Sequence, residues 1–253
     1  MIKFGVVVMA CLFLTSSYAQ IGSGKVEEPK KDTAKTVRVK RVPTDGMDET
    51  VYFGGMNINQ SFRKLEENVA PYGDPLAYRV DEVPLLRTGF HIGMRNRFHS
   101  LATYEVALSW DKFGETYSYQ AEEDDSSFNY TNTYSFISLP VQVYLTHGKD
   151  LRYFVGGGIQ PMLAMKYAYE EKYTDSLGGQ FESTIESADR LSGLTVNLLV
   201  SAGVQWRFSK LFSLYAIPSY VHGLTSTFGK QESYKHYIRA WNFRCGLTLH
   251  IPN

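Results

Sequence analysis

The chain lacks three things that common protein classes require: long apolar runs, charge of one sign and many cysteines. After the N-terminus no stretch of 18 apolar residues occurs, which excludes a helical membrane protein. The 253 residues hold 26 basic and 26 acidic side chains, so no global basic footprint points to nucleic acid as a partner. Aromatic residues make up 14%, which indicates that most of the chain is folded. These figures do not exclude a membrane β-barrel, because its alternating residues escape hydropathy averages.

The N-terminus has the three parts of a secretory signal peptide. Lys3 precedes the apolar run 4–14, and small residues follow up to Ala19. The run is too short to span a bilayer, so residues 1–19 are predicted to be a cleaved signal peptide rather than a buried N-terminal helix. Cleavage removes one of the two cysteines and leaves Cys245, so no intramolecular disulfide is expected.

Residues 20–48 are predicted to be a flexible periplasmic linker. They carry mixed charges, glycine and proline but no aromatic residue, and such a segment buries too little apolar surface to order itself. A basic cluster at 35–41 has two interpretations, a docking site for a periplasmic partner or for anionic headgroups, and a solvated tether. The tether is favoured, because short charged runs usually are solvated.

From residue 51 onward, apolar and polar residues alternate with a period of two, which predicts β-strands. In 194–206, for example, one face is apolar from Leu194 to Trp206, and most of the other is Thr, Asn, Ser, Gly and Gln. The facing of the first and seventh segments is less clear. The predicted strands are 51–60, 86–94, 102–111, 136–145, 153–160, 194–206, 211–225 and 237–251.

The connections between these strands alternate strictly between short and long. Three tight turns lie at 96–100, 146–150 and 208–210, whereas the long connections are 62–83, 121–130, 171–192 and 226–236. This is the pattern of an eight-stranded antiparallel up-and-down transmembrane β-barrel, predicted here for 49–253, with short periplasmic turns and longer outer loops. Several strand patterns exceed the length that a membrane requires, so hairpins are expected to project beyond it.

Two prolines fall inside predicted strands. Pro140 and Pro218 each remove a donor from the backbone ladder, and a closed barrel is expected to tolerate this only at a bulge or at its rim.

The composition of the polar faces indicates which side of the barrel faces lipid and which side forms the lumen. These faces carry Gly, Ser, Thr, Asn, Gln and Arg, whereas lysine gathers in the turns and loops. A soluble lipocalin-like barrel would have the same periodicity, but its water-facing side would normally hold many Lys and Glu. We therefore expect a polar lumen in which buried charges are paired. The predicted lumen network is Arg87, His91, Arg95, Glu105, Arg207 and Arg244.

Several segments resemble one known family. The run Leu139–Tyr144 (LPVQVY) resembles the "IP-apolar-x-apolar-Tyr" strand of the PorT-like outer-membrane β-barrel proteins of Bacteroidota. Phe154–Gly158 followed by Leu163 resembles their next, Gly-rich strand, and Ala202–Phe208 resembles a further strand that ends at a turn. The resemblance covers about residues 50–253 and implies an outer-membrane location. Some members are linked to protein secretion machinery, and the family supplies no agreed catalytic residues.

No constellation for chemistry emerges from the sequence. The six histidines include no pair with metal-ligand spacing, so neither a metal site nor a cofactor is expected. His91 and His250 are predicted to face the lumen, where each is a hydrogen-bonded structural group or, less favoured, a general base. No nucleophile motif accompanies them, so no catalytic residue is assigned and the protein is not expected to be an enzyme.

The expected role is therefore a non-enzymatic scaffold or partner-binding protein of the outer membrane. The expected partners are outer-membrane lipid or lipopolysaccharide, and envelope proteins bound through the acidic outer loops or the N-terminal linker. An eight-stranded barrel is filled by its own side chains and makes a poor porin. Two other roles stay open: an outer-membrane lipid-modifying enzyme, and a soluble periplasmic lipocalin-like ligand carrier.

Overall fold

The computed structural model describes residues 50–67, 82–122, 126–229 and 234–251. The predicted signal peptide, 1–19, and all of the predicted linker, 20–48, lie outside these residues, as does part of each of three long connections. The described part of the chain contains no helix suited to span a membrane.

Every regular element of the described residues is a β-strand, and all the pairings between strands are antiparallel. The strands follow one another along the chain, and two of them, β2 and β8, lie outside the ring described below. The elements are β1 (Thr50–Glu67), β2 (Val83–Pro84), β3 (Leu86–His99), β4 (Ala102–Gln120), β5 (Ser127–Ser138), β6 (Val141–Gly148), β7 (Leu151–Thr174), β8 (Gln180–Ser187), β9 (Leu194–Arg207), β10 (Phe212–Gly223) and β11 (Tyr234–Ile251).

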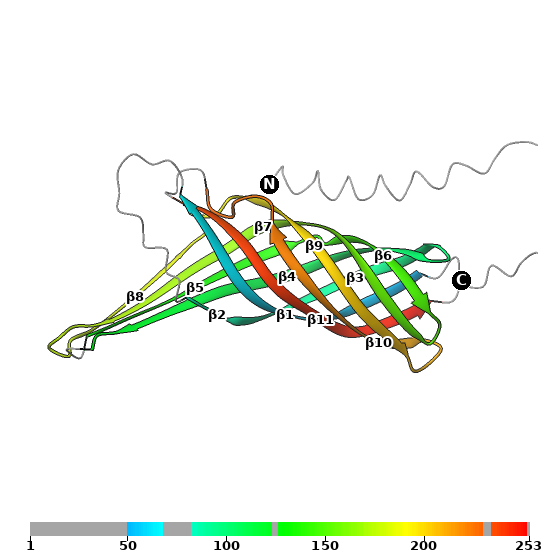
Figure 1. Ribbon diagram of the computed structural model, residues 1–253, viewed down its shortest axis with the longest axis horizontal. Coiled ribbons are helices and arrows are strands. Elements are labelled where there is room, and N and C mark those ends of the chain that lie inside the picture. Colours follow the sequence, from blue (N-terminus) through cyan, green and yellow to red (C-terminus); the bar gives the residue numbers. More distant parts are fainter. Residues whose placement is uncertain (1–49, 68–81, 123–125, 230–233, 252–253) are drawn as a thin grey trace, which may run out of the picture. The chain divides into compact units, whose positions relative to one another are not determined.

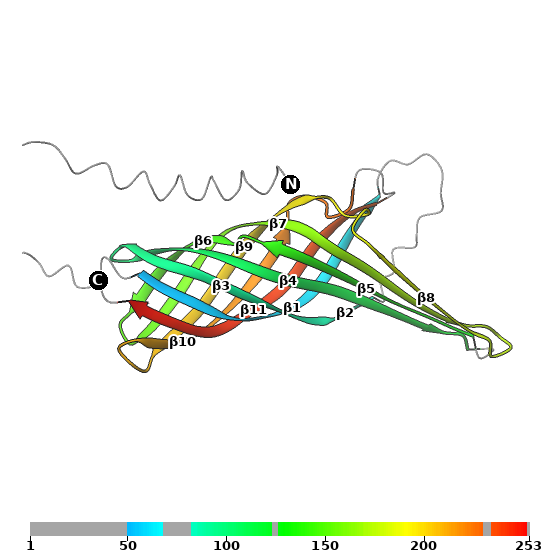
Figure 2. The same ribbon diagram turned by 180° about the vertical axis from the view of Figure 1, so that it is seen from behind.

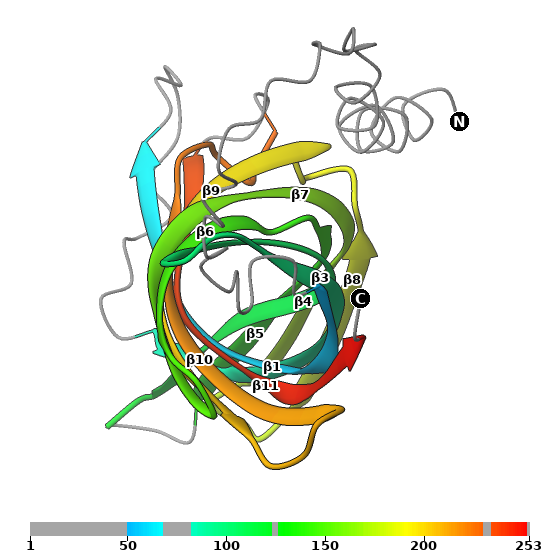
Figure 3. The same cartoon turned by 90° about the vertical axis from the view of Figure 1, so that its right-hand side faces the viewer.

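The strands close into a ring. β1 pairs with β3 on one side and with β11 on the other, so the first and last strands of the barrel are neighbours. β5 and β6 together fill one position between β4 and β7, which gives an eight-position ring in the order β1-β3-β4-β5/β6-β7-β9-β10-β11. Figure 3 looks into this ring. The predicted eight-stranded antiparallel barrel is confirmed.

The two prolines are accommodated differently. Leu139-Pro140 separates β5 from β6, and the Leu139 amide and the Pro140 carbonyl still bond to the neighbouring strands, so the ring continues across the break. Pro218 lies inside β10, opposite Phe243 of β11. On its other side the β9 ladder is interrupted between Ala216 and Ser219. The expectation of a bulge or rim was therefore wrong for Pro218, which a central strand tolerates at the cost of a local gap in one ladder.

The barrel is apolar outside and polar inside. In β3, Phe90 and Ile92 are exposed while His91 between them is buried, and the same alternation runs through β9 and β11. Ten residue steps separate Trp241 from Ile251 on the outward side of β11. At about 3.4 Å a step and a tilt of about 40°, they span about 25 Å, which is the height of the apolar band of a membrane barrel.

The structure also settles the facing of β1 and β10, which the sequence left unclear. Val51 and Phe53 of β1 point inward and are buried, whereas Tyr52 is exposed. In β10 the side chains of Ser213, Tyr215, Ile217, Ser219 and Val221 point inward and are buried. Aromatic and polar side chains thus meet inside the barrel, which shows that the lumen is packed rather than open.

At the loop end, three strands of the ring continue beyond it as an outer sheet, to which β8 adds a fourth strand. β4, β5, β7 and β8 run side by side there, away from β1 and β11 (Figures 1 and 2). Two predicted loops are therefore partly strand: the connection 121–130 already enters β5 at Ser127, and 171–192 holds the end of β7 and all of β8. The sequence missed β8 because most of it is exposed on both faces and no core imposes an apolar alternation.

Candidate functional site

An ion cluster lies inside the barrel towards the end that carries the tight turns. One carboxylate oxygen of Glu105, on β4, accepts two hydrogen bonds from Arg95 of β3, at 2.5 Å from Nη2 and 3.0 Å from Nε. Arg244 of β11 approaches the other oxygen at 2.6 Å from Nη1. The exposed fractions are 0% for Glu105, 2% for Arg95 and 5% for Arg244. One carboxylate thus neutralises part of two buried guanidinium charges and ties three strands together.

Neutral groups complete the coordination of this cluster. Arg244 Nη2 donates to the Tyr144 hydroxyl at 2.8 Å, and Arg95 Nη1 donates to Gln205 Oε1 at 3.0 Å. The Arg95 guanidinium also lies 4.4 Å from the centre of the Phe154 ring, within the range of a cation–π contact. Buried charges require such compensation, and here the Glu105 carboxylate, the Tyr144 hydroxyl, the Gln205 amide oxygen and the Phe154 ring contribute to it.

The two lumen histidines are held by hydroxyl groups. His91 lies beside the Tyr215 hydroxyl and against the Phe53 ring, so it joins the aromatic packing next to the ion cluster. His250 contacts the Ser213 hydroxyl, a juxtaposition that the sequence did not reveal because the two residues are 37 positions apart. Ser213 and His250 are both buried in the barrel wall.

A second buried acid, Asp111, has amide and hydroxyl partners instead of arginine. Asn57 and Gln160 donate to its two carboxylate oxygens at 2.8 and 2.9 Å, and Ser138 adds a hydroxyl. The alternation in β4 places Asp111 in the lumen, but only the register of β1, β5 and β7 supplies these partners. In the described residues no group of three or more His, Cys, Asp or Glu side chains is arranged to hold a metal ion.

Of the six residues predicted to share a lumen network, Arg95, Glu105 and Arg244 are in direct contact and His91 packs nearby. Arg87 and Arg207 are not part of it. Arg207 lies at the β9–β10 turn and donates to the Lys210 carbonyl at 2.9 Å.

Arg87 is displaced because β3 separates from β4 beyond Phe90, where their pairing ends. Its side chain passes Gly114, and its Nη2 donates to the Thr133 hydroxyl at 2.9 Å, on the outward side of β5. The alternation of β3 predicts that Arg87 faces the lumen. Alternation predicts the direction of a side chain only where the neighbouring strand is still paired.

A polar packed interior inside an apolar ring defines the class: the chain has the fold of a small eight-stranded β-barrel of the transmembrane type. No protein-family profile matches the sequence, and no curated protein matches it. Among solved structures, the outer-membrane protein AlkL in lipid bilayers is similar, with 11% identity and a TM-score of 0.45 over 91% of this chain and 98% of that one.

Two further solved structures are similar. OprG, an outer-membrane protein of Pseudomonas aeruginosa, has 10% identity and a TM-score of 0.44 over 82% of this chain and 98% of that one. Ail, the attachment invasion locus protein of Yersinia pestis, has 13% identity and a TM-score of 0.34 over 80% and 99% of the two chains. These are similarities of fold, and they do not bear on what this chain binds.

Proposed function

We propose that the protein is a non-enzymatic outer-membrane β-barrel that binds an envelope protein partner through the sheet at its loop end. The apolar outward belt supports membrane insertion, because a soluble lipocalin-like carrier would place its apolar side chains inward. The mutual pairing of the buried Arg95, Glu105 and Arg244 supports a structural lumen and a role without chemistry. A lipid-modifying enzyme would need a reactive pair on the outward surface, whereas Ser213 and His250 are buried.

The observation that carries the proposed partner-binding role is the free edge of β8. Among the described strands it pairs only with β7, and nearly all its residues are exposed. Phe181 and Ile185, 62% and 48% exposed, lie on one face of it. An exposed strand edge with alternate apolar side chains is the surface to which a partner adds a strand. The similarity to the PorT-like proteins favours a partner from the secretion machinery.

The acidic residues of β8 keep this edge soluble. Lys172 of β7 donates to Glu182 at 2.7 Å, and this hydrogen bond raises the pKa of Lys172. Lys166 pairs with Glu186 at the same distance. Both pairs are exposed and contribute little to stability, but they place charge beside the apolar residues and disfavour edge-to-edge aggregation.

Membrane insertion is tested by the mobility of the protein from the outer-membrane fraction in a detergent gel. We expect the unheated protein to migrate differently from the boiled protein, because a closed barrel resists unfolding by the detergent. The protein should also require detergent for extraction. Recovery in the soluble periplasmic fraction, with no mobility shift, would contradict membrane insertion.

Partner binding is tested by placing a photo-crosslinking amino acid at position 185 in growing cells. We expect a discrete adduct there and none at position 214, which faces outward in the apolar belt. The double substitution of Phe181 and Ile185 by Ser, with the crosslinker at 183, should reduce the adduct roughly tenfold or more, because two apolar contacts are lost. The matched substitution of Glu182 and Glu186 by Ser should leave most of the crosslinked adduct. An adduct that persists in the Phe181/Ile185 variant would locate the partner elsewhere.

A further inference from the structure

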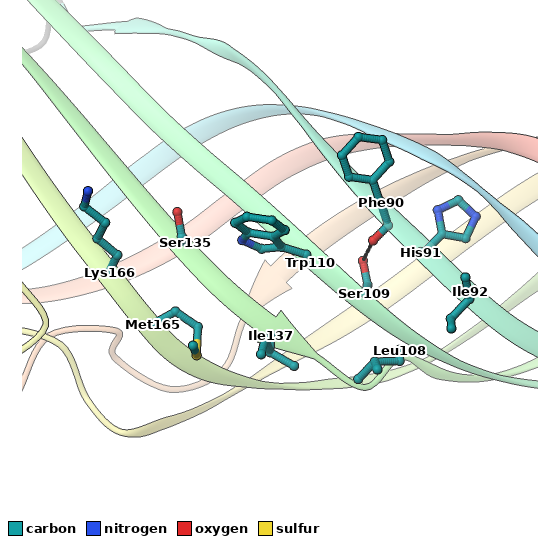
Figure 4. A pocket seen from close by; sticks show the side chains of 10 residues that line it. All are labelled: Phe90, His91, Ile92, Leu108, Ser109, Trp110, Ser135, Ile137, Met165 and Lys166. Atoms are coloured by element: carbon teal, nitrogen blue, oxygen red, sulfur yellow. Dashed lines mark hydrogen bonds between the residues drawn. The ribbon is translucent and has the colours of Figure 1, made fainter.

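The outward face of the barrel is hollowed where β3, β4, β5 and β7 meet. A groove of about 480 Å³ lies there, within the range of ligand sites in proteins. Figure 4 shows its side chains, with Ser135 and Lys166 at one end of an otherwise mainly apolar surface. The apolar lining is Phe90, Ile92, Leu108, Trp110, Ile137 and Met165.

A β-bulge helps to form the groove. Ser135 of β5 is paired with Lys166 of β7, but the next residue, Phe136, is paired with Ala164, so Met165 has no partner. The extra residue carries its exposed side chain outward at the edge of the groove. Bulges redirect side chains in this way and are frequent beside functional sites.

A basic row borders the apolar groove. Lys112 of β4 is in register with Ser135 of β5, which is in register with Lys166 of β7. All three point outward on adjacent strands, so two lysines flank a small hydroxyl residue, with their backbones about 10 Å apart. Two residue pairs further from the groove, Gly114 is in register with Thr133, and the Arg87 side chain crosses there.

The cations of this row have capacity for an anion. Arg87 uses Nη2 for Thr133, and its buried Nε has no partner in the structure. The Lys112 ammonium lies 5.0 Å from the centre of the Trp110 ring, at the boundary with the groove. Lys166 pairs with Glu186, but both side chains are about half exposed, and such a pair is weak enough to be shared with a second anion.

We infer that this surface binds one phosphorylated membrane lipid, with its phosphate on Arg87, Lys112 and Lys166 and an acyl chain along Trp110, Ile137 and Met165. The inference rests on the proposed membrane insertion. A second pocket, of about 390 Å³, holds the three cations together with Ser135 and Thr133, and it shares Ser135 and Lys166 with the apolar groove. Apolar and cationic parts are thus contiguous, in the order in which a lipid presents its chain and headgroup.

Charge and position favour a lipid with an anionic rather than a zwitterionic headgroup. The polar pocket is lined by three cations and by Glu170 and Glu186, an excess of one positive charge. Lys112 and Lys166 border the groove, whereas Glu170 lies four residue pairs further along the β5–β7 ladder. A phosphate next to the acyl chain therefore meets the cations first, and a choline group would bring a further cation to a pocket that already has an excess of one positive charge.

The test uses tryptophan fluorescence, because the chain has three tryptophans. In the variant W206F/W241F only Trp110 is left, and brominated acyl chains quench a tryptophan that they touch. The full-length protein is folded in detergent micelles and titrated with dibrominated phosphatidic acid or dibrominated phosphatidylcholine. We expect half-maximal quenching at a roughly tenfold lower concentration of phosphatidic acid, the effect of one charge-assisted hydrogen bond.

Four controls make the result specific. Adding K112A/K166A should remove the preference for phosphatidic acid, whereas adding K149A/K210A, at the turn end, should keep it. The variant W110F/W206F, which retains Trp241, should show no preference. Millimolar inorganic phosphate should not abolish the preference at Trp110. Each variant is first checked for its heat-dependent gel mobility.

Equal quenching of Trp110 by the two lipids would overturn the lipid site and leave the proposed membrane insertion intact. Loss of the preference on adding inorganic phosphate would also overturn it, because the headgroup anion alone would then be the ligand. Quenching of neither Trp110 nor Trp241 by any lipid would overturn membrane insertion, and the lipid site with it.

Discussion

Replacing Glu105 by Ala is expected to lower the free energy of unfolding by about 3–5 kcal/mol, which is the usual cost of removing one partner from a buried ion pair. Glu105 is the sole carboxylate that contacts Arg95 and Arg244 in the described lumen. Its loss would leave two buried guanidinium groups with neutral partners only. Urea unfolding of the protein in lipid vesicles, followed by tryptophan fluorescence, measures the change.

The matched control is Glu182→Gln in the outer sheet, which breaks the exposed pair with Lys172. Its effect should be much smaller, because solvent screens that pair. The triple variant R95M/E105L/R244M should recover most of the stability, since a buried ion cluster can be replaced by apolar residues of similar volume. If Glu105→Ala were as stable as the native protein, or the triple variant no better than Glu105→Ala, the cluster would not be held by charge pairing.

Gly158→Ala is expected to destabilise the barrel by about 3 kcal/mol, near the upper end of the cost of overpacking. A Cβ at Gly158 of β7 would lie 1.9 Å from the Val141 carbonyl oxygen and 2.7 Å from Gln142 Cα on β6. Backbone atoms cannot move aside as a flexible side chain does, so β6 and β7 would have to separate. The measurement is the fraction of heat-modifiable protein and its unfolding midpoint in urea.

Gly54→Ala provides the comparison at another glycine within a strand. Its Cβ would meet Ile92 Cγ2 at 3.5 Å, which is ordinary contact, so stability should be nearly unchanged. Neither glycine has a positive φ. The difference in stability between the two variants therefore reports the space available for the added Cβ and not a strained backbone conformation. Equal stability of the two alanine variants would show that β6 and β7 are less closely paired than described here.

The sequence predicted the ring because every strand inside the apolar belt must alternate, and alternation is visible in a single chain. It assigned Glu105 and Arg244 to the lumen for the same reason. It did not predict that Tyr144 and Gln205 complete the cluster, since alternation gives the face of a residue but not its height in the barrel. Height depends on the register between strands, which arises only when the ring closes.

Outside the belt the same logic failed. The alternation of β3 predicts that Arg87 faces the lumen. The pairing of β3 with β4 ends at Phe90, however, and this allows the Arg87 side chain to turn outward. β8 was taken for part of a loop, because a strand exposed on both faces needs no apolar alternation. The proposed lipid site was equally hidden, since it is formed by a bulge at Met165 and by three residues in register on three strands.

The 24 residues of β7 run without interruption from the tight turn at one end of the barrel to the tip of the outer sheet. About half of β7, from Leu151 to Leu163, is paired with β9 in the ring. The part beyond the ring therefore cannot reorient as a tethered loop does. A partner that adds to β8 would therefore meet a surface whose conformational entropy was already lost on folding. Such preorganisation lowers the entropic penalty of association, and it allows a small contact area to bind with useful affinity.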